Sequence, residues 1–247
     1  MTTGFQHYIS ETNRLITELA EAEHERILAA AEVTARCIAL GGIVHVFGSG
    51  HSNLLAQEVF HRAGGLVPVN AMLDVNLTIF GTSRATLLER LEGYGASLLT
   101  NYDVHPGEVV IIISTSGVNP VPIEVAETAR TRGATTIGVT SAAAYADAPS
   151  RHSAGTRLVD VVDLVLDTHV PVGDAIEPIG GDGVMIGATS TILGAVLLNA
   201  LMVATAEQLV AEGHPVPAFV SQNIPGGDEH NAELLATYAP RIPLMKP

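Results

Sequence analysis

The run Val109-Val110-Ile111-Ile112-Ile113 constrains the fold of this chain more than any other stretch. Five consecutive β-branched aliphatic residues predict a strand. Because no polar residue interrupts the run, both faces of the strand should be buried, as is typical of a parallel sheet under a layer of helices on each side. The sequence therefore predicts an α/β fold.

Further strands and helices alternate around this run. Residue types and apolar spacing predict five strands, at 43–47, 66–69, 109–113, 135–140 and 161–166. They predict helices at 53–63, 84–99, 121–132 and 184–210. Such alternation gives a doubly wound parallel sheet, here the five-stranded centre of a three-layer αβα sandwich. Pro68 cannot donate to a ladder, which places the strand at 66–69 on an edge.

The remaining segments divide the chain into three parts. Residues 1–40 form a helical arm, either one long helix or two short ones, which ends at Gly41-Gly42. Residues 41–212 form the α/β domain, and residues 213–247 form a tail with a short helix at 230–238. We assign no element to 70–82 and expect surface loops at 142–157 and 167–182.

Composition excludes several classes of function. The net charge of −14 argues against nucleic acid as a partner, since phosphates need a basic surface. The start of the chain lacks a secretory signal, and the single Cys37 fits a reducing cytoplasm. We find no apolar run suited to crossing a bilayer and expect no membrane partner. A small phosphate ester can still bind an acidic protein through backbone N–H groups and hydroxyls.

Two polar loops follow strands of the predicted sheet. The first, Gly48-Ser49-Gly50-His51-Ser52, leads from a strand into a helix, an arrangement that can hold an anion. Alone it could equally be a tight turn without a ligand, and Asn53 stands where a dinucleotide turn needs a third glycine. The second, Ser114-Thr115-Ser116-Gly117-Val118-Asn119, precedes Pro120 and a helix. Both loops should converge at the carboxyl ends of their strands, where ligands bind in such sheets.

With these two loops in place, the chain resembles the SIS (sugar isomerase) domain family. It is most similar to a bacterial branch described as phosphosugar isomerases. Features shared with that branch are Glu58-Val59-Phe60, Arg62-Ala63-Gly64-Gly65, Pro171-Val172-Gly173-Asp174-Ala175, and Ser221-Gln222-Asn223 with Asn231. The departures are Asn119, where the family has Thr or Ser, and His61, where an aromatic residue is expected.

The resemblance implies a flavodoxin-like sheet, a homodimer or homotetramer, and a sugar phosphate as ligand. It implies that residues of the two loops hold the phosphate and sugar. These are Gly48, Ser49, Gly50, His51, Ser52, Ser114, Thr115, Ser116 and Asn119.

Isomerisation of an aldose to a ketose requires a base that moves a proton between adjacent carbons. Glu58 is the candidate base, because it lies two helical turns from Ser52; the alternative is a surface salt bridge with Arg62 at i+4. His61 should share a helix face with Glu58 and could open the sugar ring, as could His230 in the tail.

Phosphoheptose isomerases of this superfamily hold zinc with a similar residue set. This chain has only a loosely similar set, formed by Glu58, His61, Gln222 and His230. We predict no metal and no cofactor. Three other residues carry less weight: His45 should be a core histidine, and His169 and Glu177 follow the fifth strand near the expected pocket.

The sequence thus predicts a cytoplasmic phosphosugar-binding protein, most simply an aldose–ketose isomerase, with an amino sugar among the candidate substrates. Two alternatives stay open. One is a sensor that binds a sugar phosphate without turnover, and the other is a lyase or etherase that uses the same base for elimination.

Overall fold

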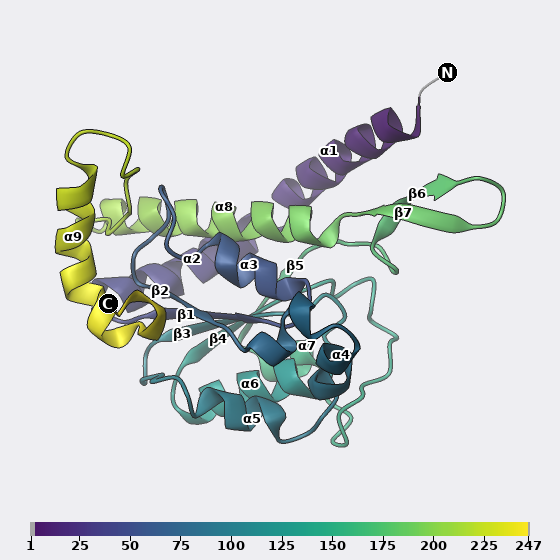
Figure 1. The fold of residues 1–247 in the computed structure, drawn as a ribbon, viewed down its shortest axis with the longest axis horizontal. Helices are drawn as coiled ribbons and strands as arrows, with labels where there is room; N and C mark the ends of the chain where they lie inside the picture. Colours follow the sequence, from purple (N-terminus) through teal and green to yellow (C-terminus); the bar gives the residue numbers. More distant parts are fainter. Residues whose placement is uncertain (1–2, 247) are drawn as a thin grey trace.

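A computed structural model describes residues 3–246. Its centre is a sheet of five parallel strands in the order β2-β1-β3-β4-β5, which confirms the predicted fold class (Figure 1). The strands are β1 (Val44–Gly48), β2 (Val69–Met72), β3 (Val109–Ile113), β4 (Thr135–Thr140) and β5 (Leu164–Asp167). β2 lies on an edge, as Pro68 predicted.

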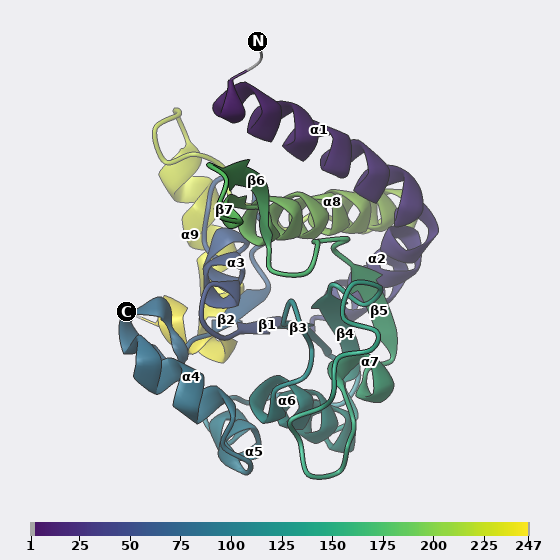
Figure 2. The same ribbon diagram turned by 90° about the vertical axis from the view of Figure 1, so that its right-hand side faces the viewer.

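Helices cover both faces of the sheet (Figure 2). On one face lie α2 (His24–Ala39), α3 (Ser52–Glu58) and α8 (Ser190–Ala211). On the other lie α4 (Ser83–Glu89), α5 (Tyr94–Leu99), α6 (Pro120–Thr131) and α7 (Leu158–Val161). β3 shows why its sequence lacks polar residues: Val109, Ile111 and Ile113 join one core cluster, whereas Val110 and Ile112 join the other.

The N-terminal arm consists of two helices, and the second belongs to the body of the protein. α1 (Gly4–Ala22) and α2 are separated at Glu23. Glu23 is fully buried and accepts a hydrogen bond from the Asp167 N–H (3.0 Å). α1 extends away from the sheet beside the β6–β7 hairpin (Figure 1).

This hairpin corrects the prediction for residues 167–188. β6 (Ala175–Ile179) and β7 (Val184–Ala188) form an antiparallel pair where we expected a loop and the start of a long helix. The helix begins at Ser190 instead, because the Asp174 carboxylate accepts hydrogen bonds from the Thr189 and Ser190 N–H groups (2.8 and 2.7 Å). A carboxylate at this position satisfies helix-end donors that would otherwise be unpaired.

Three other elements differ from the predictions. The helix expected at 84–99 is divided into α4 and α5, and Gly93 between them has a φ of +85°. β2 begins at Val69, while Leu66 bridges Ala218 of the tail. Residues 75–81 form two short 3₁₀ turns, η1 (Val75–Leu77) and η2 (Ile79–Gly81).

α8 also corrects the prediction about membranes. With 22 residues it is long and apolar enough to cross a bilayer by length and composition, although 44% of its most apolar window is buried inside the protein. α8 contributes Leu193, Leu197 and Leu201 to the core between the sheet and the layer of α2, α3 and α8.

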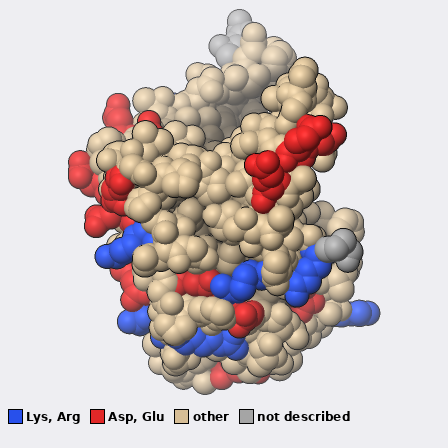
Figure 3. Space-filling model, turned by 90° about the vertical axis from the view of Figure 1, so that its left-hand side faces the viewer, with Lys and Arg blue, Asp and Glu red and all other residues tan. Residues whose placement is uncertain are grey.

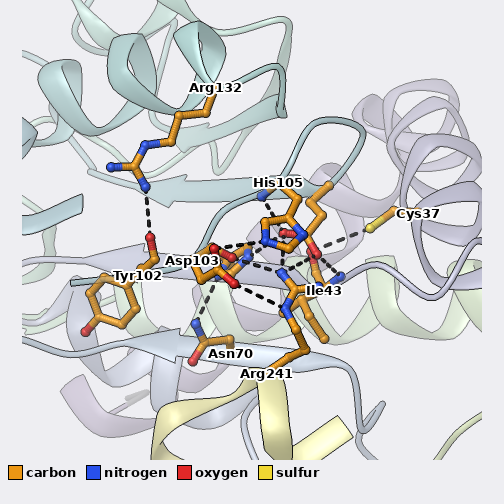
Figure 4. Close-up of polar contacts among 10 residues, drawn as sticks. Cys37, Ile43, Asn70, Tyr102, Asp103, His105, Arg132 and Arg241 are labelled. Carbon is orange, nitrogen blue, oxygen red and sulfur yellow. Dashed lines mark hydrogen bonds and ion pairs between the residues drawn. The ribbon is translucent and has the colours of Figure 1, made fainter. Parts of the chain in front are cut away.

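The tail returns to the amino edge of the sheet. It comprises α9 (Gly227–Tyr238), η3 (Ala239–Arg241) and η4 (Pro243–Met245). Arg241 reaches a buried cluster around Glu108, which accepts hydrogen bonds from the Ile43 and His105 N–H groups (2.9 and 2.8 Å; Figure 4). His45, predicted as a core histidine, is 1% exposed and lies 3.1 Å from the same carboxylate. Burial alone would raise the pKa of Glu108, but the hydrogen bonds from His45 and the two N–H groups outweigh it and lower the pKa to about 2.

Candidate functional site

The two polar loops lie side by side at the carboxyl edge of the sheet. β1 pairs with β3 so that Gly48 stands opposite Ile113. The first loop (residues 48–52) and the second loop (residues 114–119) therefore leave the sheet as neighbours, which confirms the predicted convergence. Strand order reverses between β1 and β3, and this switch point is the usual ligand crevice of a doubly wound sheet.

The second loop presents backbone N–H groups that lack partners. Within the described chain, those of Thr115, Ser116, Val118 and Asn119 donate to no other group. Val118 and Asn119 are nevertheless buried, at 5% and 7% exposure. Buried N–H groups are nearly always paired, so a run of free ones indicates a place for an acceptor such as phosphate.

The shape of the second loop depends on Gly117 and on its carbonyl contacts. Gly117 has a φ of +64°, and an added Cβ would lie 3.1 Å from the Thr140 hydroxyl oxygen. The loop carbonyls point toward neighbouring segments: that of Thr115 accepts from the Ser141 N–H (2.9 Å), and that of Gly117 from the Leu158 N–H (2.8 Å). With its carbonyls engaged elsewhere, the loop can direct N–H groups toward a ligand.

Side chains add donors to the second loop. The hydroxyls of Thr115 and Ser116 are half-buried and have no hydrogen-bond partner among residues 3–246. Ser114 is buried, and its hydroxyl accepts from the Gly117 N–H (3.3 Å). The Asn119 side-chain oxygen accepts from the Arg151 guanidinium (2.8 Å), which leaves the amide nitrogen available as a donor.

The first loop is more fully occupied by internal contacts. Gly50 N–H donates to the Leu77 carbonyl (2.7 Å), and the buried Ser49 hydroxyl donates to Glu89 (2.7 Å). Gly48 must remain a glycine because a Cβ there would lie 2.3 Å from the Ser52 carbonyl oxygen. His51 is exposed and Ser52, the first residue of α3, is half-buried. Within the first loop, and among residues 3–246, Ser49 is the residue whose side chain is committed to another residue.

Glu58 is the last residue of α3 and forms the salt bridge that its spacing from Arg62 allows. Its Oε1 accepts from Arg62 and, at 3.3 Å, from the Asn199 side-chain amide of α8. The Glu58 side chain is 36% exposed. The carboxylate is therefore held in place yet accessible.

The predicted helical pairing of Glu58 with His61 is wrong. α3 ends at Glu58, and His61 has a left-handed φ of +43°. The chain leaves the helix because residues 64–65 pair with the tail: Gly64 N–H donates to the Phe219 carbonyl (2.8 Å), and Phe219 N–H donates to the Gly65 carbonyl (2.9 Å). The His61 ring instead stands edge-on to Phe219, with centroids 4.8 Å apart.

The other predicted tail residues lie close to this junction of residues 61–66 with the tail. Gln222 lines a cavity of about 260 Å³ together with His61. His230, on α9, lies with Nε2 3.0 Å from the Ala218 carbonyl oxygen. Among residues 3–246, no three His, Cys, Asp or Glu side chains are grouped as metal ligands would be.

His169 and Glu177, expected near the pocket, and Asp174 between them have structural contacts. His169 lies 3.0 Å from Glu23, and Glu177 lies 2.6 Å from His7 of α1. Asp174 caps α8. The side chains of all three residues are therefore engaged in contacts with other residues.

Arg151 is the site residue that the sequence did not reveal. It lies in the 142–157 segment. The backbone of this segment contacts the second loop through a hydrogen bond from the Arg151 N–H to the Val118 carbonyl (2.9 Å). Its guanidinium places positive charge beside Asn119. No motif marks this residue, because only the path of the surface segment brings it to the loop.

Comparison with known proteins agrees with the α/β fold. A model of the SIS domain matches residues 7–141. A UPF0309 protein of Geobacillus thermodenitrificans is 39% identical over 239 residues, which cover 96% of each chain. A UPF0309 protein of Listeria innocua is 38% identical over 240 residues, or 97% of each chain.

Solved structures share the fold at lower identity. Phosphoheptose isomerase from Neisseria gonorrhoeae has a TM-score of 0.54 at 18% identity, covering 81% of this chain and 96% of its own. The enzyme from Francisella tularensis has a TM-score of 0.56 at 16% identity, covering 82% and 96%. The Vibrio vulnificus NanR protein complexed with ManNAc-6P has a TM-score of 0.50 at 15% identity, covering 97% and 69%.

Proposed function

The chain belongs to the SIS domain family, and from that premise we propose that it binds a sugar phosphate at the switch point and isomerises it between aldose and ketose forms. The observation that carries the proposal is the set of four second-loop N–H groups, and the hydroxyls of Thr115 and Ser116 beside them, that have no partner within residues 3–246. Such donors can hold a phosphate dianion in a protein whose overall charge is negative.

The roles follow from position. The second loop, Ser52 and the Asn119 amide hold the phosphate, and Arg151 offsets part of its charge. Glu58 lies six residues after Ser52 along α3, about 9 Å at 1.5 Å per residue, so its carboxylate can reach the carbon end of a sugar. There it removes the proton from C2 and returns it to C1, with a ring-opening group such as His61 or His230 assisting.

Binding is tested first by thermal shift with a panel of aldose, ketose and amino-sugar phosphates, with the unphosphorylated sugars as controls. A ligand at a hundredfold excess over its Kd adds about 2.7 kcal/mol to the free energy of unfolding. Stabilisation by phosphorylated sugars alone supports the proposed site. No stabilisation by any of them contradicts it.

Turnover is tested by incubating each stabilising sugar phosphate in D₂O and following deuterium at C2 by NMR. Exchange with formation of the paired aldose or ketose supports isomerase activity. Exchange with loss of a β-substituent identifies a lyase or etherase. Tight binding with no exchange identifies a sensor, the alternative that the likeness to a sugar-phosphate complex favours. We expect the protein to act in the cytoplasm, where sugar phosphates occur.

A further inference from the structure

Residues 75–84 line a second cavity at the carboxyl edge of the sheet, next to the proposed phosphate site. The cavity, called the side pocket here, encloses about 400 Å³ between the two 3₁₀ turns that follow β2 and the start of α4. Its walls include Val75, Asn76, Phe80, Thr82, Ser83 and Arg84. None of these residues has a part in the proposed phosphate site.

The side pocket adjoins the first loop through backbone contacts. Gly50 forms a parallel bridge with Thr78, and the Gly50 N–H donates to the Leu77 carbonyl (2.7 Å). Because β1 lies between β2 and β3, the side pocket, the first loop and the second loop stand in a row along one edge of the sheet. Neighbouring strands are about 4.8 Å apart, so β2 and β3 are about 10 Å apart. A ligand longer than one sugar ring can therefore reach from the second loop to the side pocket.

Internal contacts fix the wall of the side pocket that η1 and η2 form. The Asp74 carboxylate accepts hydrogen bonds from the Asn76 N–H (2.8 Å) and, through its other oxygen, from the Tyr94 hydroxyl (2.6 Å). Gly81 packs so closely on this wall that an added Cβ would lie 2.4 Å from the Asn76 carbonyl oxygen. The wall is therefore pre-organised, which lowers the entropy cost of binding a ligand.

Thr82 lies in this wall with a strained backbone. It stands between η2 and α4 and has a φ of +49° and a ψ of −130°. A positive φ is rare for a β-branched residue, and strain of this kind is concentrated at ligand-binding and switch regions. The strain therefore agrees with a binding role for the side pocket.

The side pocket combines an exposed aromatic ring with free polar groups. Phe80 is 80% exposed and Val75 is 69% exposed. Four polar groups around them have no hydrogen-bond or ion-pair partner within residues 3–246: the side-chain oxygen of Asn76, the hydroxyls of Thr82 and Ser83, and the Arg84 guanidinium. This combination suits a sugar ring, because its C–H groups pack on the negative face of an aromatic ring and its hydroxyls find donors and acceptors.

The free guanidinium of Arg84 contrasts with basic residues elsewhere on the molecule. On the side that carries α9, basic side chains lie beside acidic ones in the lower half of the view (Figure 3). Arg241 of the tail, for example, forms ion pairs with Asp103 and Glu108. The Arg84 donors instead remain available for the hydroxyls of a ligand.

We propose that the side pocket holds a second sugar ring, so that the ligand of this protein is a phosphorylated disaccharide. This inference rests on the proposed function of the second loop and Glu58. The second loop holds the phosphate, the first ring lies over the first loop, and the second ring stacks on Phe80. The second ring is joined through O3 or O4 of the first, because isomerisation takes place at C1 and C2.

The test compares glucose 6-phosphate with its 3-O-glucosyl and 4-O-glucosyl derivatives by isothermal titration calorimetry. Wild type should bind at least one derivative about tenfold more tightly than glucose 6-phosphate, the gain expected from one stacked ring. Phe80→Ser should reduce this affinity ratio to about one. Leu87→Ser is the matched control, because Leu87 is 69% exposed on α4 and lies outside the side pocket, and it should keep the ratio.

Two further variants make the test specific. Arg84→Gln removes the charged donor and should also lower the ratio, and it replaces Phe80→Ser if circular dichroism shows that variant to be misfolded. Ser116→Ala, in the second loop, should weaken all three compounds alike and keep the ratio. The first variant thus reports on the side pocket, and the second reports on the phosphate site.

The outcomes separate this inference from the proposed function. Binding of glucose 6-phosphate without a gain for either derivative, or an unchanged ratio in both side-pocket variants, overturns the second-ring site and leaves the phosphate site standing. No binding of any sugar phosphate overturns the proposed function and this inference together. Light scattering that gives a smaller mass for Phe80→Ser than for wild type shows that a second copy covers Phe80, and this result also overturns the proposal.

Discussion

At the scale of single residues, the candidate site works through groups that other parts of the protein leave free. The Ser116 hydroxyl and four of the second-loop N–H groups have no partner within residues 3–246, whereas the Ser49 hydroxyl is held by Glu89. Two serines in similar loops therefore have different expected roles. The difference lies in their neighbours, because the motifs themselves are alike.

Ser116→Ala should weaken binding of a phosphorylated sugar and leave the fold intact. A lost hydrogen bond to a charged group costs roughly 1.5–3 kcal/mol, or about a 10- to 150-fold rise in Kd. Isothermal titration calorimetry measures the change. Ser97→Ala, on the exposed surface of α5, is the control that should bind normally. Equal affinity in both variants would remove Ser116 from the site.

Glu58→Gln should reduce kcat by roughly 10²–10⁴-fold, since an amide keeps the shape of the side chain but cannot accept the C2 proton. KM should change little because the two loops hold the phosphate independently. Deuterium uptake at C2 should fall in parallel. Glu229→Gln on exposed α9 serves as the control. Normal turnover in Glu58→Gln would transfer the base role to His61 or His230.

At the scale of elements, short polar contacts decide where helices start and stop. α8 is continuous in apolar character with β7, yet the two are separated where Asp174 binds the Thr189 and Ser190 N–H groups. α3 stops at Glu58 because the following residues pair with the tail. The boundaries thus depend on partners that are distant in sequence.

Asp174→Ala should lower the free energy of unfolding by about 0.5–2 kcal/mol, the usual cost of losing a helix cap. For a domain of this size each kcal/mol lowers Tm by about 2–4 °C. Asp174→Asn should recover most of the loss, because the one Asn oxygen can accept the two N–H bonds that Oδ1 of Asp174 accepts, and Asn tolerates the φ of +69° at this position. Calorimetry of both variants provides the check, and an unaffected Tm in Asp174→Ala would argue against the cap.

At the scale of the whole molecule, the Glu108 cluster joins segments from both ends of the chain. Ile43, before β1, and Arg241, near the C-terminus, both contact the Glu108 carboxylate. The tail is thereby fixed to the amino edge of the sheet, where Arg241 lies close to Ile43 (Figure 4). The candidate site lies at the opposite end of the strands.

This cluster should make stability depend on pH in the acidic range. The pKa of Glu108 is lowered from 4.5 in the unfolded chain to about 2 in the folded protein, so its contribution is fully present above pH 4.5 and is lost as pH falls toward 2. The contribution is about 3 kcal/mol, since each pKa unit corresponds to about 1.4 kcal/mol. Chemical denaturation of wild type and Glu108→Gln at several pH values measures it. The difference between the two should shrink between pH 4.5 and 2, and a constant difference would contradict this role.

The sequence by itself determined the sheet and the position of the two loops. Val109–Ile113 required burial on both faces, and that requirement fixed a parallel sheet with helices on each side. The carboxyl ends of parallel strands lie at a common edge of the sheet. The loops with Ser52 and Ser116, which follow two such strands, therefore had to lie at the same edge. These features follow from local residue pattern and from the geometry of parallel strands.

Only the tertiary structure decided which polar groups in those loops stay free and what surrounds them. Glu89 engages Ser49, Arg151 reaches Asn119, and the tail ends α3 before His61. The residues of the first contact are 40 positions apart and those of the second 32, and the tail lies still farther from residues 64–65 along the chain. A hydrogen bond depends on position in space to within a few tenths of an ångström, and no periodicity in the chain encodes that position.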